Sequence, residues 1–166
     1  MTSSLVGSEM CIRDSSKTFN PVYGYKELEA IFGDRRPESA KELEEAVRAV
    51  RARKLPDPKV LPNAGSFFKN PVVTRTKMLH LLEETPSLVS YPLGGARAKI
   101  AAGWLIEACG LKGKRMGQAG VYERQTLILV NYGGATGAEI KALAEEVARN
   151  VKYRFGVELE PEPVIL

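Results

Sequence analysis

Apolar side chains recur every three or four positions in several segments of the chain, a spacing that places them on one face of a helix. The clearest example opens at residues 36–39 and ends before Pro56, with Leu43, Val47 and Val50 on one face. Its proline, at position 37, suits the first turn of a helix. The same spacing predicts further helices over residues 25–32, 76–84, 98–109 and 138–151.

Short apolar runs between turn residues predict strands at residues 64–69, 121–122, 126–130 and 156–160. The proline-rich segment 54–63 predicts an extended connector, and residues 85–95 predict a loop. The glycine-rich segment 133–137 follows a strand but lacks the Lys-Ser/Thr pair of a phosphate-binding loop, so we expect a plain turn. Because helices and short strands are interspersed, the expected fold class is α+β, a small sheet covered by helices.

Composition narrows the possible functions. The chain has 166 residues, 44% of them hydrophobic and 27% charged, which is ordinary for a soluble globular protein. No apolar run is long enough for a transmembrane helix, so we expect no membrane partner. Two cysteines, Cys11 and Cys109, and one histidine, His80, cannot make a disulfide framework or a four-ligand zinc site. We therefore predict no metal site.

The net charge of +4 is modest, and the basic residues are mixed with acidic ones. Two short basic clusters stand out, and either could hold a phosphate group or simply form a solvated face. They are Arg48, Arg51, Arg53 and Lys54, and Lys112, Lys114 and Arg115. Because neither cluster is interleaved with aromatic residues, a nucleic-acid binder remains the less favoured alternative.

Residues 1–15 fit neither a signal peptide nor any regular element. The run SLVGSEMCIRDS matches the translation of a common sequencing adapter, so we interpret residues 1–15 as a disordered, adapter-derived scar. A native disordered tail is the alternative.

The segment NAGSFFKNP, residues 63–71, has the densest concentration of candidate chemistry. Gly65 allows a backbone to approach a ligand closely, and Ser66, Lys69 and Asn70 supply a hydroxyl, an amine and an amide within five residues. The segment therefore suits binding of a polar ligand, or else it is a turn followed by a core strand.

A second candidate lies in the segment LEPEP, residues 159–163. Two prolines fix the backbone around Glu162, and a fixed carboxylate can act as a general acid. The alternative is a solvated tail. Arg124 and Gln125, just before the predicted strand 126–130, could direct polar groups to the same cleft.

These motifs resemble the UDP-N-acetylenolpyruvoylglucosamine reductases, also called UDP-N-acetylmuramate dehydrogenases. The matching segments occur in the family's order, and PVYG and KLPDP resemble its longer subclass. They are PVYG (21–24), KLPDP (54–58), NAGSFFKNP (63–71), AAGWLIEACGLKG (101–113) and LEPE (159–162). The resemblance implies a bacterial, cytoplasmic flavoenzyme of peptidoglycan synthesis. It uses FAD and NADPH to reduce UDP-N-acetylglucosamine enolpyruvate to UDP-N-acetylmuramate.

The resemblance also implies roles for individual residues. Ser66 resembles the serine that delivers a proton to the substrate carbon, and Glu162 the glutamate that polarises the substrate carboxylate. Substrate-binding roles are implied for Tyr23, Lys54, Asn70 and Gln125, and proximity to the flavin for Gly65 and Ser66. Pro163 and Val164 stand where the family often has an aliphatic residue and an arginine, which puts one flavin contact in question.

The resemblance further implies that the chain is a C-terminal portion of the reductase, inactive alone because the flavin domain is missing. We expect a scar at 1–15, a remnant of the flavin domain and linker at 16–34, a substrate-binding domain at 35–158, and a segment carrying the catalytic glutamate at 159–166. We expect a monomer. A nucleotide-sugar binding module without catalysis is the alternative function.

Overall fold

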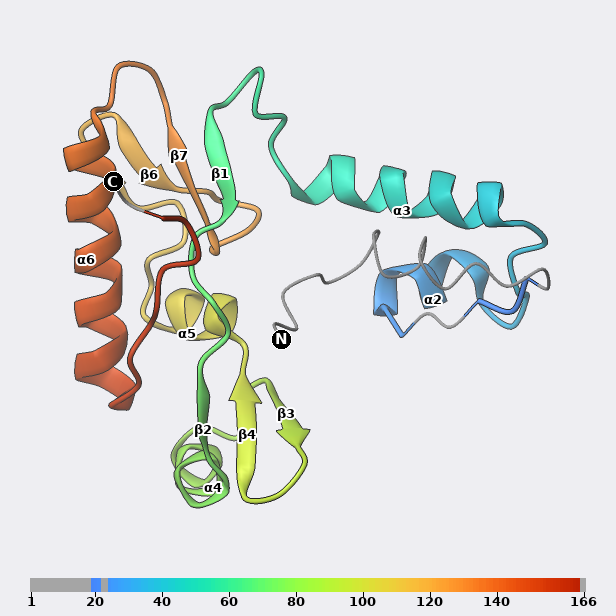
Figure 1. Ribbon diagram of the computed structural model, residues 1–166, viewed down its shortest axis with the longest axis horizontal. Coiled ribbons are helices and arrows are strands. Elements are labelled where there is room, and N and C mark those ends of the chain that lie inside the picture. Colours follow the sequence, from blue (N-terminus) through green and yellow to red (C-terminus); the bar gives the residue numbers. More distant parts are fainter. Residues whose placement is uncertain (1–18, 22–23, 165–166) are drawn as a thin grey trace. The chain divides into compact units, whose positions relative to one another are not determined.

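The chain divides into two compact units, one reaching Arg53 and the other beginning at Lys54. The structure is a computed structural model, and it describes residues 19–21 and 24–164 (Figure 1). The expected scar at residues 1–15 and the predicted substrate residue Tyr23 lie outside the described residues.

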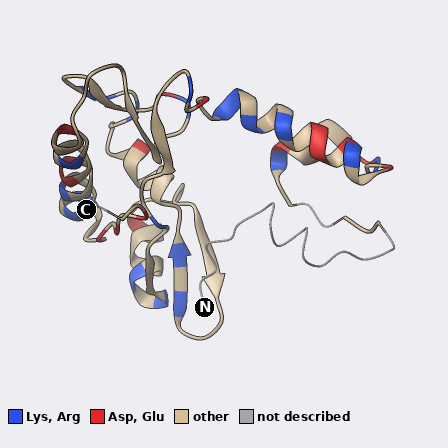
Figure 2. Ribbon diagram, turned by 45° about the horizontal axis from the view of Figure 1, so that its top comes forward, with Lys and Arg blue, Asp and Glu red and all other residues tan. Residues whose placement is uncertain are grey.

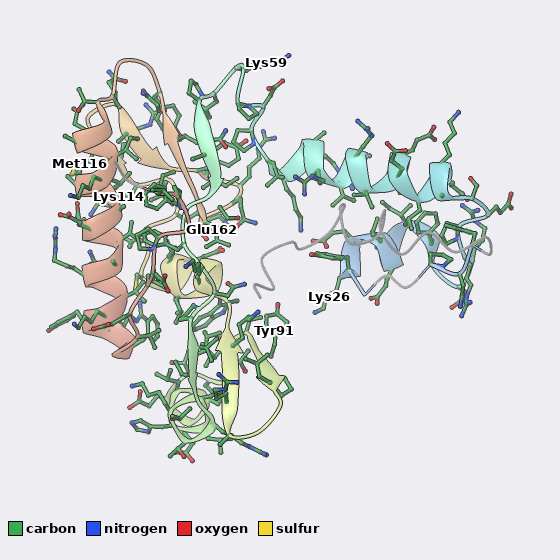
Figure 3. The ribbon with its side chains drawn as sticks, in the orientation of Figure 1. Lys26, Lys59, Tyr91, Lys114, Met116 and Glu162 are labelled. Carbon is green, nitrogen blue, oxygen red and sulfur yellow. The ribbon has the colours of Figure 1, made fainter. Side chains whose placement is uncertain are left out.

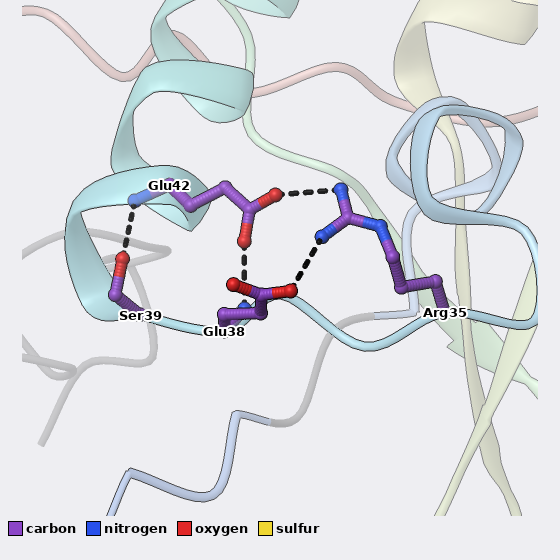
Figure 4. Close-up of polar contacts among 4 residues, drawn as sticks. All are labelled: Arg35, Glu38, Ser39 and Glu42. Carbon is purple, nitrogen blue, oxygen red and sulfur yellow. Dashed lines mark hydrogen bonds and ion pairs between the residues drawn. The ribbon is translucent and has the colours of Figure 1, made fainter.

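The first unit contains two helices, α2 (Lys26–Phe32) and α3 (Ala40–Lys54). The start of α3 is fixed by Glu42 (Figure 4). Its backbone N–H donates to Ser39 Oγ at 3.2 Å, and its carboxylate accepts from the Glu38 backbone N–H and from Arg35, each at 2.6 Å. The Arg35 hydrogen bond, followed by that from Glu38, lowers the pKa of the Glu42 carboxyl. A charged carboxylate in the first turn also suits the helix dipole.

The core of the second unit is a four-stranded antiparallel sheet in the order β1-β7-β6-β5. Every residue of β6, and all but the last residue of β7, is buried. The long helix α6 runs along one side of this sheet and packs Leu143, Val147 and Val151 into the core (Figure 1). The elements are β1 (Asn63–Ser66), β5 (Arg115–Met116), β6 (Ala119–Val121), β7 (Ile128–Asn131) and α6 (Gly137–Phe155).

Both ends of α6 are capped by the local sequence. Thr136 and Glu139 form a reciprocal capping box, in which Thr136 Oγ1 accepts from the Glu139 N–H while the Glu139 carboxylate accepts from the Thr136 N–H. At the other end Gly156 takes a left-handed conformation with φ of 59°.

A second, three-stranded antiparallel sheet has the order β2-β4-β3. The helix α4 contacts β2 and β4, and Leu81 is its buried residue. The elements are β2 (Val72–Thr74), α4 (Arg75–Glu84), β3 (Ser90–Leu93), β4 (Arg97–Ile100) and α5 (Ala102–Ala108).

The predicted α+β class is confirmed, with two small sheets rather than one. Three local predictions are wrong. The loop predicted at 85–95 contains β3, and the helix predicted at 98–109 is split between β4 and α5. The strand predicted at 156–160 is irregular backbone; just after it, Pro161 forms an isolated bridge with Phe68, flanked by backbone hydrogen bonds.

None of the described helices is long and apolar enough to cross a membrane.

Candidate active-site surface

The end of β1 carries Ser66 on an irregular edge strand. Asn63 pairs with Val130 and Ser66 pairs with Ile128, so β1 uses one residue more than β7 over this stretch. Such a bulge bends a strand and redirects its side chains. Asn63 Oδ1 accepts from the Gly65 N–H at 2.9 Å, and Gly65 has φ of 74°, a conformation that favours glycine. Ser66 is exposed as a result.

Gly65 leaves open space beside the serine. Apart from its chain neighbours, no atom lies within 4 Å of where a side chain on Gly65 would begin. A flat ring could therefore approach this edge of β1, and the predicted position of Gly65 and Ser66 near a flavin stays a prediction. The fit is limited to this edge.

Backbone hydrogen bonds join the segment around Glu162 to Phe67 and Lys69, just after Ser66 in the chain. The Glu162 N–H donates to the Phe67 carbonyl at 2.8 Å, and the Lys69 N–H donates to the Glu160 carbonyl at 2.9 Å. An ion pair of 2.6 Å between Lys69 Nζ and Glu160 Oε1 adds to this contact. Figure 3 shows Glu162 in the middle of the second unit, with its side chain exposed. Glu162 is thus joined to Phe67, the residue after Ser66, and the predicted catalytic roles of the serine and the glutamate stay predictions.

Asn70 and Gln125 both lie at the first turn of α5. Asn70 Oδ1 accepts from the Ala102 N–H at 2.9 Å, and Thr126 Oγ1 donates to the Gly103 carbonyl at 2.7 Å. A side chain on Gly103 would begin 3.4 Å from Gln125 Oε1, so the amide of Gln125 lies beside the helix. The Asn70 Nδ2 group makes no hydrogen bond to the described chain and stays available to a ligand.

Two further polar residues, Lys99 and Tyr91, lie in the three-stranded sheet whose first strand, β2, begins two residues after Asn70. Val72, two positions after Asn70, pairs with Lys99, and Lys99 pairs with Tyr91 on the next strand. Directly paired residues share a face of a sheet, so Val72, Lys99 and Tyr91 form one row, and Asn70 lies just before the strand at its end. Tyr91 is 52% exposed (Figure 3), and Lys99 has no ion pair within the described part of the chain. Sequence reasoning missed this row, although the alternation in Arg97–Ile100 was its signal.

Lys54 is the last residue of α3 and is half-buried. Its predicted substrate-binding role stays a prediction, as does that of Tyr23. Within residues 19–21 and 24–164 no group of three or more His, Cys, Asp or Glu side chains could hold a metal ion.

The sequence model of one protein family matches residues 57–166, and its description is "UDP-N-acetylenolpyruvoylglucosamine reductase, C-terminal domain". The chain belongs to this family. The resemblance predicted from the motifs is therefore confirmed, and the matched region contains Ser66, Asn70, Gln125 and Glu162.

Curated relatives carry the name UDP-N-acetylenolpyruvoylglucosamine reductase. The protein of Chromobacterium violaceum is 58% identical over 125 residues, which cover 75% of this chain and 37% of that protein. The protein of Paraburkholderia xenovorans is 53% identical over 154 residues, covering 90% of this chain and 44% of that protein. The chain thus spans less than half the length of either relative.

A crystal structure of the UDP-N-acetylenolpyruvylglucosamine reductase from Thermus caldophilus is also similar. The sequence identity is 29%, the TM-score is 0.41, and the match covers 77% of this chain and 36% of that one.

Proposed function

We propose that this member of the reductase family supplies the substrate-binding side of an enzyme that converts UDP-N-acetylglucosamine enolpyruvate to UDP-N-acetylmuramate in the bacterial cytoplasm. FAD, reduced by NADPH, would supply the hydride when bound. The observation that carries the proposal is the hydrogen bond from the Glu162 N–H to the carbonyl of Phe67, which joins the residue with the carboxylate to the chain neighbour of Ser66.

In the proposed reaction Ser66 Oγ donates a proton to the substrate carbon next to the carboxylate. A serine hydroxyl is a poor acid in water, so the surroundings must stabilise the alkoxide that it leaves. We assign to Glu162 the task of hydrogen-bonding the substrate carboxylate, which stabilises negative charge as the carbon accepts hydride. Ser66 and Glu162 are both exposed, so each group is accessible to a substrate.

Asn70 and Gln125 would hold the nucleotide sugar through their amides, with Tyr23 and Lys54 as further binding groups. The row of Lys99 and Tyr91 extends this surface with one cation and one phenol, a combination suited to a phosphate and an adjoining ring. Asn70 is held at the first turn of α5 by the hydrogen bond that it accepts from the Ala102 N–H, which suits the precise orientation of a polar ligand.

Calorimetric titration of this chain with UDP-N-acetylmuramate tests the binding role. Asn70→Ala should weaken binding about tenfold through the loss of amide hydrogen bonds. Ser87→Ala, an exposed serine in the loop after α4, is the control and should leave affinity unchanged. Equal affinities for the parent, Asn70→Ala and Ser87→Ala would reject the assignment of Asn70.

Catalysis is tested by transplanting residues 57–166 into the Paraburkholderia xenovorans relative in place of its matching segment. Ser66→Ala in this hybrid should lower kcat about 10²-fold or more, because proton transfer loses its donor. An unchanged kcat would remove Ser66 from the reaction. Binding of UDP-N-acetylmuramate by the chain, combined with an inactive hybrid, would instead support the nucleotide-sugar binding module.

The chain alone is expected to be inactive. Visible absorbance of bound flavin in the purified chain, together with consumption of NADPH, would contradict this expectation.

A further inference from the structure

A groove runs between α4 and the end of the β3–β4 hairpin, outside the surface described above. Most of its apolar lining comes from Met78, Leu79, Pro92 and Leu93. Two arginines, Arg75 and Arg97, also line it. Its volume is about 250 Å³. Its lining residues include none of Ser66, Asn70, Gln125 and Glu162. We call it the α4 groove.

The two arginines of the α4 groove lack partners of opposite charge. Within the described part of the chain, neither guanidinium group forms an ion pair or a side-chain hydrogen bond. No acidic residue lines the groove, and the first turn of α4 has none either. Figure 2 shows Lys and Arg colouring on both α4 and β4 at this end of the unit.

The positive charge of Arg75 is also unfavourably placed with respect to the dipole of α4. Arg75 is the first residue of α4, and cations are disfavoured at the positive end of a helix dipole. Glu83 and Glu84, the acidic residues of α4, lie at the opposite end, and Glu84 is within 3.5 Å of His80. A carboxylate from another molecule would relieve the unbalanced charge at Arg75.

The size of the α4 groove limits its occupant. Sites for whole small-molecule ligands usually have about 300–1,000 Å³. A volume of about 250 Å³ instead suits one large apolar side chain. Where proteins meet, a few anchor side chains buried in pockets supply most of the affinity, and arginine is often among the residues that contribute most.

We propose that the α4 groove docks an acidic segment of a partner protein, with one large apolar side chain in the groove and carboxylates beside it paired with Arg75 and Arg97. The proposal is independent of the proposed reductase function, because its residues take no part in that site. Leu79, 47% exposed, becomes covered on docking, and Met78 can adjust its flexible side chain to the anchor.

The test follows the Met78 methyl signal of the full chain by NMR during titration with the capped peptide acetyl-Glu-Leu-Asp-amide. Two control peptides replace either both acids by Gln and Asn or the leucine by serine. We expect a saturable shift with the first peptide, and at least threefold weaker binding of each control. Equal binding of the uncharged peptide, or no shift with any peptide, would overturn the proposal.

Variants place the interaction on the groove. Arg75→Gln and Arg97→Gln should each weaken binding about threefold, the effect expected of a partly exposed ion pair. Leu79→Asp adds a carboxylate at an exposed position and should abolish the shift without disturbing the core. Arg149→Gln, an exposed arginine on α6, is the control and should bind as the parent does. If Arg149→Gln weakens peptide binding as much as Arg97→Gln does, the peptide is attracted by overall charge, and the proposal that it docks in the α4 groove is refuted.

Discussion

Replacing Gly120 by alanine tests how tightly the four-stranded sheet is packed. Gly120 lies in β6, an inner strand, and a Cβ there would be 2.6 Å from Tyr132 Cε2 and 3.3 Å from the Lys114 carbonyl oxygen. The Tyr132 ring also makes a cation–π contact, with the Arg115 guanidinium 3.5 Å from its centre. The added methyl must therefore displace the ring or bend the strand.

The expected cost follows from these contacts. Forcing one carbon into a packed interior destabilises a protein by about 1–3 kcal/mol, and loss of the cation–π contact adds about 0.5–1 kcal/mol. Alanine lowers the conformational entropy of the unfolded chain relative to glycine, which offsets about 0.4–1 kcal/mol of this loss. We expect Gly120→Ala to lose about 2 kcal/mol, and its Tm to fall by roughly 5–10 °C.

Urea and thermal unfolding followed by circular dichroism measure this loss. Gly137→Ala is the matched control, since a Cβ at Gly137 meets no atom within 4 Å and its φ is not positive. A second variant, Tyr132→Ser, removes the obstructing ring, and in that background the cost of Gly120→Ala should shrink to below about 1 kcal/mol. If Gly120→Ala and Gly137→Ala unfold at the same urea concentration, the packing argument is wrong.

Three other predictions concern stability. Leu105→Ala, at a fully buried position of α5, should lose about 2–5 kcal/mol in urea unfolding, whereas a loss under 1 kcal/mol would place Leu105 outside the core. Thr136→Ala removes the α6 capping box and should lose about 1 kcal/mol; an unchanged urea midpoint would refute a role for the cap. The Glu139 carboxyl has a pKa below its ordinary value of 4.5, chiefly because it accepts the Thr136 N–H, so its contribution is complete above that pH. This contribution is lost as the pH falls through the lowered pKa that Glu139 has in the folded state. Because glutamine does not titrate, Glu139→Gln should make the free energy of unfolding less dependent on pH below about 4.5.

Periodicity predicted the elements whose stability comes from their own sequence. The helix predicted at 138–151 is observed at Gly137–Phe155, where an apolar face and a capping box agree. The helix at 98–109 failed because Ala98, Ala101 and Ala102 favour helix locally, while pairing with β2 and β3 holds the first of them in a strand. β3 was missed because Pro92 suggests a loop, but proline is tolerated at the edge of a sheet.

The candidate site was predictable where its groups are close in sequence. Ser66 and Asn70 lie within one short motif, and Gly65 beside them marks the left-handed turn. The placement of Glu162 beside Phe67 depends on pairing between distant segments, and no local pattern specifies that pairing. The row of Lys99 and Tyr91 was hidden for the same reason, because two strands must pair before it exists.

The pairing of the segment around Glu160 with Lys69 also has a kinetic consequence. The Lys69–Glu160 ion pair closes a loop of 91 residues. Contacts between such distant residues form late, because closing a long loop lowers the entropy of the chain before the contact forms and stabilises it. A growing chain would therefore complete its sheets and α6 first. The serine and the glutamate would meet only in one of the last steps of folding, so the polar surface would be assembled on an already folded support.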